Sequence, residues 1–160
     1  MHMEHTLRRV VTGHDSDGKS IIVLDDKPAV ALIGGTEDRR VLIKVWATIL
    51  KPTPGGLGVE PQEISQSTAF EPRASEFRVV DMPAGSRREM HRTDTVDYGI
   101  VLAGEVHLVL EQEETLLHTG DVVVQRGTFH AWHNRSDRVA RMAFINLSGQ
   151  VTDERRCPEV

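Results

Sequence analysis

The stretch from Gly85 to Gly104 concentrates side chains that could do chemistry. His91, Thr93 and Asp97 stand at positions i, i+2 and i+6. Residues two apart in a β-strand share a face, so this spacing would place an imidazole, a hydroxyl and a carboxylate on one side, together with Val101. Imidazoles titrate near neutral pH and bind metal ions, which makes acid–base or metal chemistry the first possibility.

A second stretch has the same character. After Gly127 the chain carries His130, Trp132 and Asn134 at alternate positions. If this strand lies beside the one that follows Gly85, His91 and His130 converge inside one cavity. The alternative reading of each histidine is a hydrogen-bonded structural residue, and the functional reading depends on the two strands being neighbours.

The first stretch resembles the first motif of the cupin superfamily, and of its small single-domain jelly-roll members in particular. Gly85, His91 and Gly104 occupy motif positions. Thr93 stands where that motif has a second histidine, and Asp97 stands where it has glutamate. The second stretch is similar to the second motif through its glycine, histidine and asparagine, while Gln125 replaces a proline.

The resemblance implies an all-β fold, the double-stranded β-helix or jelly-roll barrel of cupins. In that superfamily the two motifs hold a divalent metal ion with three histidines and one glutamate. Carried over residue by residue, the resemblance predicts a metal site of His91, Asp97 and His130, with Fe, Zn, Mn or Ni as the ion. The same three residues are the predicted catalytic groups, and Thr93, Trp132 and Val101 the predicted substrate contacts. Asp97 is one methylene shorter than glutamate, and its alternative role is an ion pair with an arginine at the barrel rim.

The elements that must position these residues read as short β-strands separated by turns. Turn signals such as Thr119-Gly120-Asp121 punctuate the chain at the spacing of an antiparallel barrel. Strands are predicted at Ser20–Leu24, Val41–Leu50, Phe77–Asp81, Tyr98–Ala103, Val106–Glu111, Val122–Gln125 and Ala140–Leu147. In this pattern Tyr98 points away from the site, and Asn134 fixes the turn after its strand.

The chain is expected to form one structural domain that has three parts. Residues 1–75 form N-terminal strands and an arm packed on the barrel, residues 76–150 form the barrel, and residues 151–160 form a tail. Within the first part, Lys51 to Ser75 is rich in Pro and Gly and reads either as a lid over the barrel or as a disordered linker, with a short helix around Pro61–Gln66.

Composition narrows the function classes. The 160 residues carry a formal charge of −5, which disfavours a general nucleic-acid surface. The doublets Arg39-Arg40 and Arg87-Arg88 are read as solvated edges or loops. No apolar run is long enough to cross a membrane, and a cytoplasmic location is expected. The edge strands of a small barrel favour a homodimer in which the N-terminal fifty residues swap.

These expectations lead to three candidate functions. The first is a metal-dependent lyase, either a dehydratase or a decarboxylase, acting on a small hydroxy- or keto-compound through an enolate. The second is a non-haem Fe(II) dioxygenase with the same ligands. The third is a non-catalytic barrel that binds or senses a small molecule.

Overall fold

The computed structural model describes residues 6–34, 39–49 and 74–148, and within these ranges the chain forms strands and no helix. The strands are β1 (Arg9–His14), β2 (Ser20–Asp26), β3 (Val30–Ile33), β4 (Arg40–Ile49), β5 (Ala74–Met82), β6 (Thr95–Ala103), β7 (Glu105–Leu110), β8 (Glu114–His118), β9 (Val122–Arg126), β10 (His130–His133) and β11 (Ala140–Ser148). The predicted all-β class is confirmed, and each predicted strand has a counterpart. The predicted helix, the Pro/Gly loop up to residue 73, and the tail lie outside the described residues. Membrane-spanning helices are absent from the described part of the chain.

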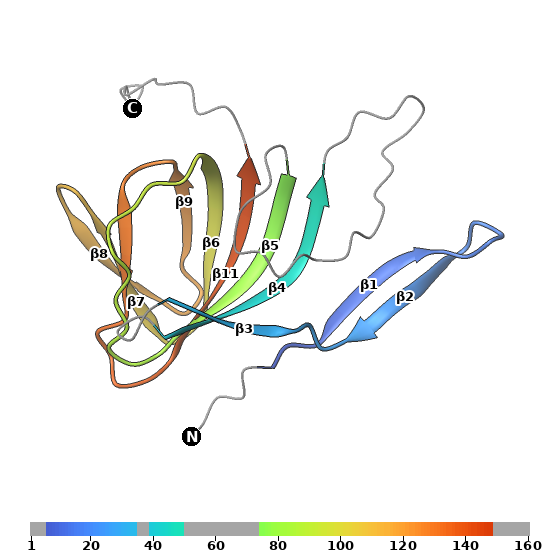
Figure 1. The fold of residues 1–160 in the computed structure, drawn as a ribbon, viewed down its shortest axis with the longest axis horizontal. Helices are drawn as coiled ribbons and strands as arrows, with labels where there is room; N and C mark the ends of the chain where they lie inside the picture. Colours follow the sequence, from blue (N-terminus) through green and yellow to red (C-terminus); the bar gives the residue numbers. More distant parts are fainter. Residues whose placement is uncertain (1–5, 35–38, 50–73, 149–160) are drawn as a thin grey trace.

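The barrel is made of two sheets (Figure 1). A six-stranded sheet has the order β3-β4-β5-β11-β6-β9, and a three-stranded sheet has the order β10-β7-β8. All pairings are antiparallel. Strands β3 and β4, which the sequence assigned to the N-terminal arm, are therefore part of the barrel sheet. The arm proper is the hairpin β1–β2, which projects away from the barrel.

The main core lies between the two sheets. Its members come from alternate positions of the strands, because residues two apart face the same side. In β6, for example, Thr95, Asp97 and Val101 are buried, whereas Tyr98 and Leu102 are exposed. The buried cluster consists of Leu42, Val80, Met82, Val101, Val106, Leu108, Trp132, Ala140, Met142 and Phe144.

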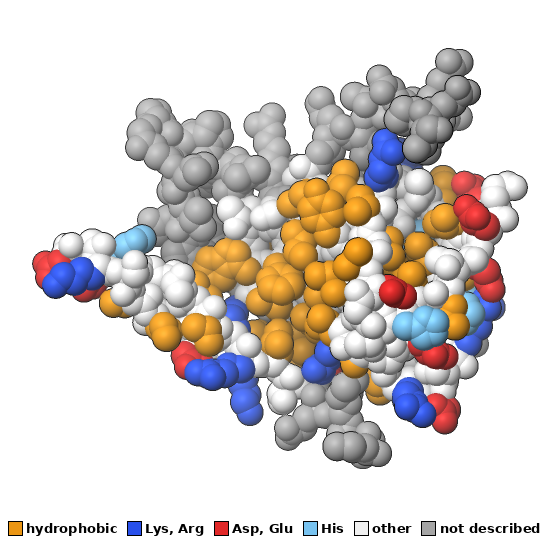
Figure 2. Space-filling model, turned by 180° about the vertical axis from the view of Figure 1, so that it is seen from behind, with side chains coloured by type: hydrophobic (Ala, Val, Ile, Leu, Met, Phe, Trp, Pro, Cys, Tyr) orange, Lys and Arg blue, Asp and Glu red, His pale blue; other side chains and the backbone are white. Residues whose placement is uncertain are grey.

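The opposite face of the six-stranded sheet is apolar as well. Val41, Ile43, Val45, Val79 and Ala143 form a second buried cluster there. Hydrophobic side chains gather across the middle of this side of the molecule, as seen from behind (Figure 2). The sheet thus carries apolar residues on both faces, a pattern typical of strands that are covered on both sides.

Two local features fix the chain next to the strands that form the site. The Asn134 side-chain amide donates to the carbonyl oxygens of Met82, Pro83 and Arg138 at 2.9, 3.1 and 2.7 Å, and its own oxygen accepts from Ser136. This confirms that Asn134 holds the turn after β10. Gly104, between β6 and β7, has φ +74°, and a Cβ at this position would lie 2.8 Å from the Val139 carbonyl oxygen.

Candidate functional site

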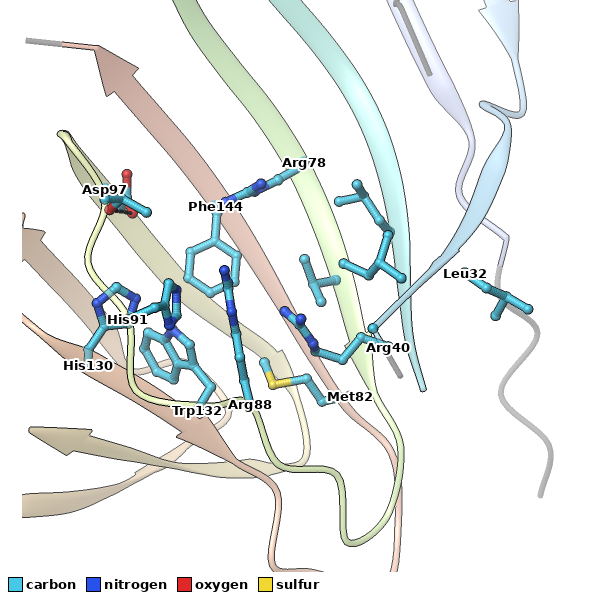
Figure 3. A pocket seen from close by; sticks show the side chains of 15 residues that line it. Leu32, Arg40, Arg78, Met82, Arg88, His91, Asp97, His130, Trp132 and Phe144 are labelled. Atoms are coloured by element: carbon cyan, nitrogen blue, oxygen red, sulfur yellow. Dashed lines mark hydrogen bonds between the residues drawn. The ribbon is translucent and has the colours of Figure 1, made fainter. Parts of the chain in front are cut away.

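A cavity of about 470 Å³ opens between the sheets at one end of the barrel. Its walls are formed by strands of both sheets, including the edge strand β3, and by the irregular segment between β5 and β6 (Figure 3). The lining residues are Leu32, Ile33, Gly34, Arg40, Leu42, Arg78, Val80, Met82, Arg88, His91, Thr93, Asp97, His130, Trp132 and Phe144.

His91 and His130 face each other, as the sequence predicted. Their backbones exchange two hydrogen bonds, each with an N···O distance of 2.9 Å. The ring centroids lie 4.3 Å apart. The predicted regular strand from His91 onward is not continuous, because β6 begins only at Thr95 and His91 forms an isolated bridge to β10. The bridge, rather than strand regularity, brings the two imidazoles together.

Both imidazoles are held in the same tautomer. The Nδ1 atom of His91 lies 3.0 Å from the Glu89 carbonyl oxygen, and Nδ1 of His130 lies 3.0 Å from the Thr128 carbonyl oxygen. A carbonyl oxygen only accepts hydrogen bonds, so each Nδ1 carries the proton. Each neutral ring therefore has its free lone pair on Nε2. The Nε2 atom of His91 is buried and has no hydrogen-bond partner.

The environment keeps both rings neutral. Burial, followed by the positive charge of Arg88 and then by His130, lowers the pKa of His91 from 6.5 to about 4. Burial is also the main cause that lowers the pKa of His130. At neutral pH the pair consequently offers lone pairs and no charge.

Asp97 is buried but lies apart from the two rings in the cavity (Figure 3). One of its oxygens, Oδ2, accepts a hydrogen bond of 3.5 Å from the Thr93 hydroxyl, and Oδ1 is buried without a partner. Its negative charge acts on the Arg78 guanidinium. This interaction is weaker than that of Glu76 with the same guanidinium, and Arg78 lies in the cavity, whereas the alternative role considered for Asp97 was an ion pair at the rim.

The arginines are the part of the site that sequence reasoning missed. Arg40 and Arg88 line the cavity, whereas both doublets were read as solvated edges; only Arg39 and Arg87 are exposed. Arg78 also lines the cavity, where its Nε is buried without a partner and burial lowers its pKa. Strand parity could have found it, because Arg78 alternates with two buried residues of β5.

The rest of the lining is an apolar wall. The Trp132 ring meets the Phe144 ring edge-on at a centroid distance of 5.6 Å, and the His130 ring at 6.0 Å. Gly99 leaves room for this arrangement, because a Cβ there would lie 3.3 Å from the Phe144 ring. Trp132 and Thr93 are placed on the cavity. Val101 is fully buried in the core and is not one of the lining residues.

The residues present do not assemble the predicted three-ligand metal site. No group of three or more His, Cys, Asp or Glu side chains lies close enough to hold a metal ion within residues 6–34, 39–49 and 74–148. Three guanidinium groups share the cavity with a single carboxylate among its lining residues, and this charge balance opposes a divalent cation. Metal binding by the two imidazoles with Asp97 stays a prediction.

Comparison with known proteins gives a consistent picture. Residues 78–146 match the family model described as "Cupin domain". Phomopsin biosynthesis cluster protein D of Diaporthe leptostromiformis is 39% identical, over 91% of this chain and 80% of its own length. The cupin-domain-containing oxidoreductase srdB of Neurospora crassa is 31% identical, over 87% of this chain and 72% of its own length. The Cnp3 cupin domain of Schizosaccharomyces pombe superposes with a TM-score of 0.53 at 12% identity, covering 92% of this chain and 90% of that one.

Proposed function

Because this chain belongs to the cupin family, we propose that it is an enzyme that acts on a small carbonyl compound with an acidic group. In this proposal His91 and His130 move protons on that compound. The main support for the proposal is a pair of neutral imidazoles in a cavity lined by arginines. Hydrogen bonds from each Nδ1 to a backbone carbonyl oxygen hold the two rings in place. Relatives named as oxidoreductases and as biosynthesis cluster proteins support an enzymatic role. The reaction class we propose is that of a lyase, with dehydration of a β-hydroxy acid as the leading case.

The arginines define the acidic part of the substrate. A guanidinium binds a carboxylate through two parallel N–H bonds, and Arg40 and Arg88 lie on the same wall of the cavity as Met82 (Figure 3). The apolar wall of Trp132 and Phe144 then receives the carbon skeleton. A cavity of about 470 Å³ is of the size that small-molecule sites have.

The imidazoles supply the proton transfer. His91 Nε2 takes a proton from the carbon next to the carbonyl group, and the electron pair of that C–H bond moves to the carbonyl oxygen as an enolate. Collapse of the enolate expels the β-hydroxyl, which takes the proton back from the imidazolium and leaves as water. His130 Nε2 accepts a hydrogen bond from that hydroxyl and orients it. The nearby guanidinium groups stabilise the negative charge of the enolate.

Substrate binding would also strengthen the base. Arg88 is the second-largest cause that lowers the pKa of His91, after burial. A bound carboxylate offsets the Arg88 charge, so the pKa of His91 rises toward the range in which an imidazole is an effective general base. The free enzyme would then hold its base in a weak form that the acidic substrate activates.

The names of the relatives favour a second candidate, an oxidoreductase. A dioxygenase of this family would need a metal ion, which the two imidazoles would hold with a third ligand. It differs from the lyase in one observable: it consumes dioxygen with each turnover, while the lyase works under argon.

The test follows exchange of the proton next to the carbonyl group. The purified chain is incubated in D₂O, under argon and with a chelator, with a panel of small β-hydroxy and β-keto acids, and NMR records deuterium uptake and new alkene or decarboxylated products. We expect His91→Gln to reduce exchange at least a hundredfold, in line with the usual contribution of a general base. His133→Gln is the matched control, because His133 lies on the same strand as His130 but outside the cavity lining.

Two further variants separate binding from proton transfer. Arg88→Met should raise KM for acidic compounds, whereas Arg87→Met, which removes the exposed neighbour, should leave KM unchanged. Turnover that requires added Fe(II) and dioxygen would overturn the proposed lyase activity and support the oxidoreductase instead. Ligand binding without exchange or product in any condition would leave a non-catalytic binding barrel.

A further inference from the structure

A row of buried polar side chains crosses the six-stranded sheet next to the cavity. Cross-strand register joins Asn146 of β11 to Glu76 of β5 on one side and to Asp97 of β6 on the other. Asp97 is in turn opposite Gln125 of β9. These four residues are only 1% to 5% exposed. Because buried positions are mostly apolar, four polar side chains at neighbouring positions call for an explanation.

The row faces the same side of the sheet as the cavity lining. Residues two apart in a strand share a face, so Asn146 continues the face of Phe144, and Glu76 continues the face of Arg78. Phe144, Arg78 and Asp97 all line the cavity. The row therefore lies directly at one side of the cavity, with Asp97 belonging to both.

Three members of the row each have a buried oxygen without a hydrogen-bond partner. These atoms are Oε1 of Glu76, Oδ1 of Asp97 and Oδ1 of Asn146. Gln125 differs, because its side-chain amide donates to the Thr128 carbonyl oxygen at 3.2 Å. Buried polar atoms are nearly always hydrogen-bonded, so each exception points to a ligand, an ion or a water molecule. Three acceptors in one row indicate a group that donates several hydrogen bonds.

We propose that Glu76, Asp97 and Asn146 form a subsite for a primary ammonium group, so that the substrate is an acid that also carries an amino group. The inference rests on the proposed function, in which arginines hold the acidic group. An ammonium group donates three hydrogen bonds and accepts none, which matches three acceptor oxygens. Two of these oxygens belong to carboxylates, and hydrogen bonds between charged groups are roughly twice as strong as neutral ones.

The charges around the cavity suit a zwitterion. Asp97 and Arg40 lie on different sides of the cavity in Figure 3, so the two charged ends of one compound would have separate partners. The negative charges of Glu76 and Asp97 both act on Arg78 and offset its positive charge. A zwitterion adds no net charge to the cavity, whereas a divalent cation would add two positive charges to those of the arginines.

The test measures binding to the full chain with two series of compounds of increasing length. One series consists of ω-amino acids from glycine to aminocaproate, and the other of the plain carboxylic acids from acetate to caproate. Isothermal titration calorimetry gives Kd for each compound. At the length that spans the cavity, the amino acid should bind at least tenfold more tightly than the plain acid, as expected for charge-assisted hydrogen bonds.

Two variants assign this preference to the row. Glu76→Gln should remove the tenfold preference and leave the affinity for plain acids unchanged. Glu113→Gln is the matched control, because it makes the same chemical change at an exposed position between β7 and β8 and should keep the preference. Asn146→Leu should also weaken amino-acid binding, while Tm stays the same or rises, because Oδ1 of Asn146 has no hydrogen bond to lose.

The outcomes separate this inference from the proposed function. Equal binding of amino and plain acids at every length, or a preference that survives Glu76→Gln, would overturn the ammonium subsite alone. A lower Tm of Asn146→Leu with unchanged amino-acid affinity would show a structural role and overturn it as well. Tighter binding of ω-hydroxy acids than of amino acids would replace the ammonium group by a hydroxyl group. If no acid binds, the acidic group of the proposed substrate falls together with the subsite.

Discussion

The ion pair between Asp81 and Arg141 should dominate the stability of the outer sheet face. The Asp81 side chain is 0% exposed and that of Arg141 is 16% exposed. Arg141 donates to both carboxylate oxygens, at 2.5 and 2.7 Å. Arg141→Met would remove this bidentate ion pair from a buried carboxylate, and breaking a buried pair costs about 3–5 kcal/mol. For a chain of this size each kcal/mol lowers Tm by about 2–4 °C, so the expected decrease in Tm is about 6–20 °C.

The chain contains a matched control for this prediction. Arg135 binds Glu114 in the same two-point geometry, with both distances 2.7 Å, but the side chains are 47% and 44% exposed. Arg135→Met should cost far less than Arg141→Met, because solvent screens an exposed ion pair. Urea unfolding and differential scanning calorimetry of both variants measure the difference. Equal losses would refute the reasoning, as would a double variant Asp81→Leu/Arg141→Met that is no more stable than Arg141→Met alone.

Three further changes test other parts of the structure. Because the pKa of His91 is lowered in the folded state, the unfolded chain binds a proton more readily; stability should fall as pH drops from 6.5 to about 4, and unfolding curves of His91→Gln should show a smaller fall. Asn134→Ala removes the donor to three carbonyl oxygens and should lower the free energy of unfolding, measured in urea, by about 3 kcal/mol. A decrease below about 1 kcal/mol would contradict the role of Asn134 in holding the turn. Gly104→Ala places a Cβ on a left-handed backbone and against the Val139 carbonyl oxygen, so it should lower the free energy of unfolding by about 2–3 kcal/mol. Gly18→Ala, at φ +76° but with open space around the Cβ, should lower it by only about 1 kcal/mol.

Local sequence patterns were sufficient for the strands predicted by range and for the histidine pair, but they gave no range for β1, β3 or β8. Alternation of apolar residues marked β6 and β9, and the motif positions of His91 and His130 required neighbouring strands, which the bridge confirms. The outward direction of Tyr98 followed from the same parity. These features depend on residues close together in the sequence, where strand geometry leaves few choices.

Long-range pairing was the part that the sequence did not reveal. Strand β4 pairs with β5 across a separation of more than twenty residues. The residue pattern of β4 itself does not indicate which strand lies beside it. The sequence therefore did not reveal that β3 and β4 of the predicted N-terminal segment belong to the barrel sheet. The cavity role of Arg40 and Arg88 was missed for a related reason, since a doublet is usually solvated and only the assembled barrel shows that one member of each faces inward.

The same residues suggest why the site departs from the family's metal pattern. Where the first cupin motif has a histidine and a glutamate, this chain has Thr93 and the shorter Asp97, so ligands for a cation are reduced. In the same cavity Arg78 and Arg88 add positive charge. Both features act in one direction, because each makes the cavity less favourable for a cation and more favourable for an anion. This charge balance is consistent with the acidic substrate that we propose, for which the His91–His130 pair would be the source of proton transfer.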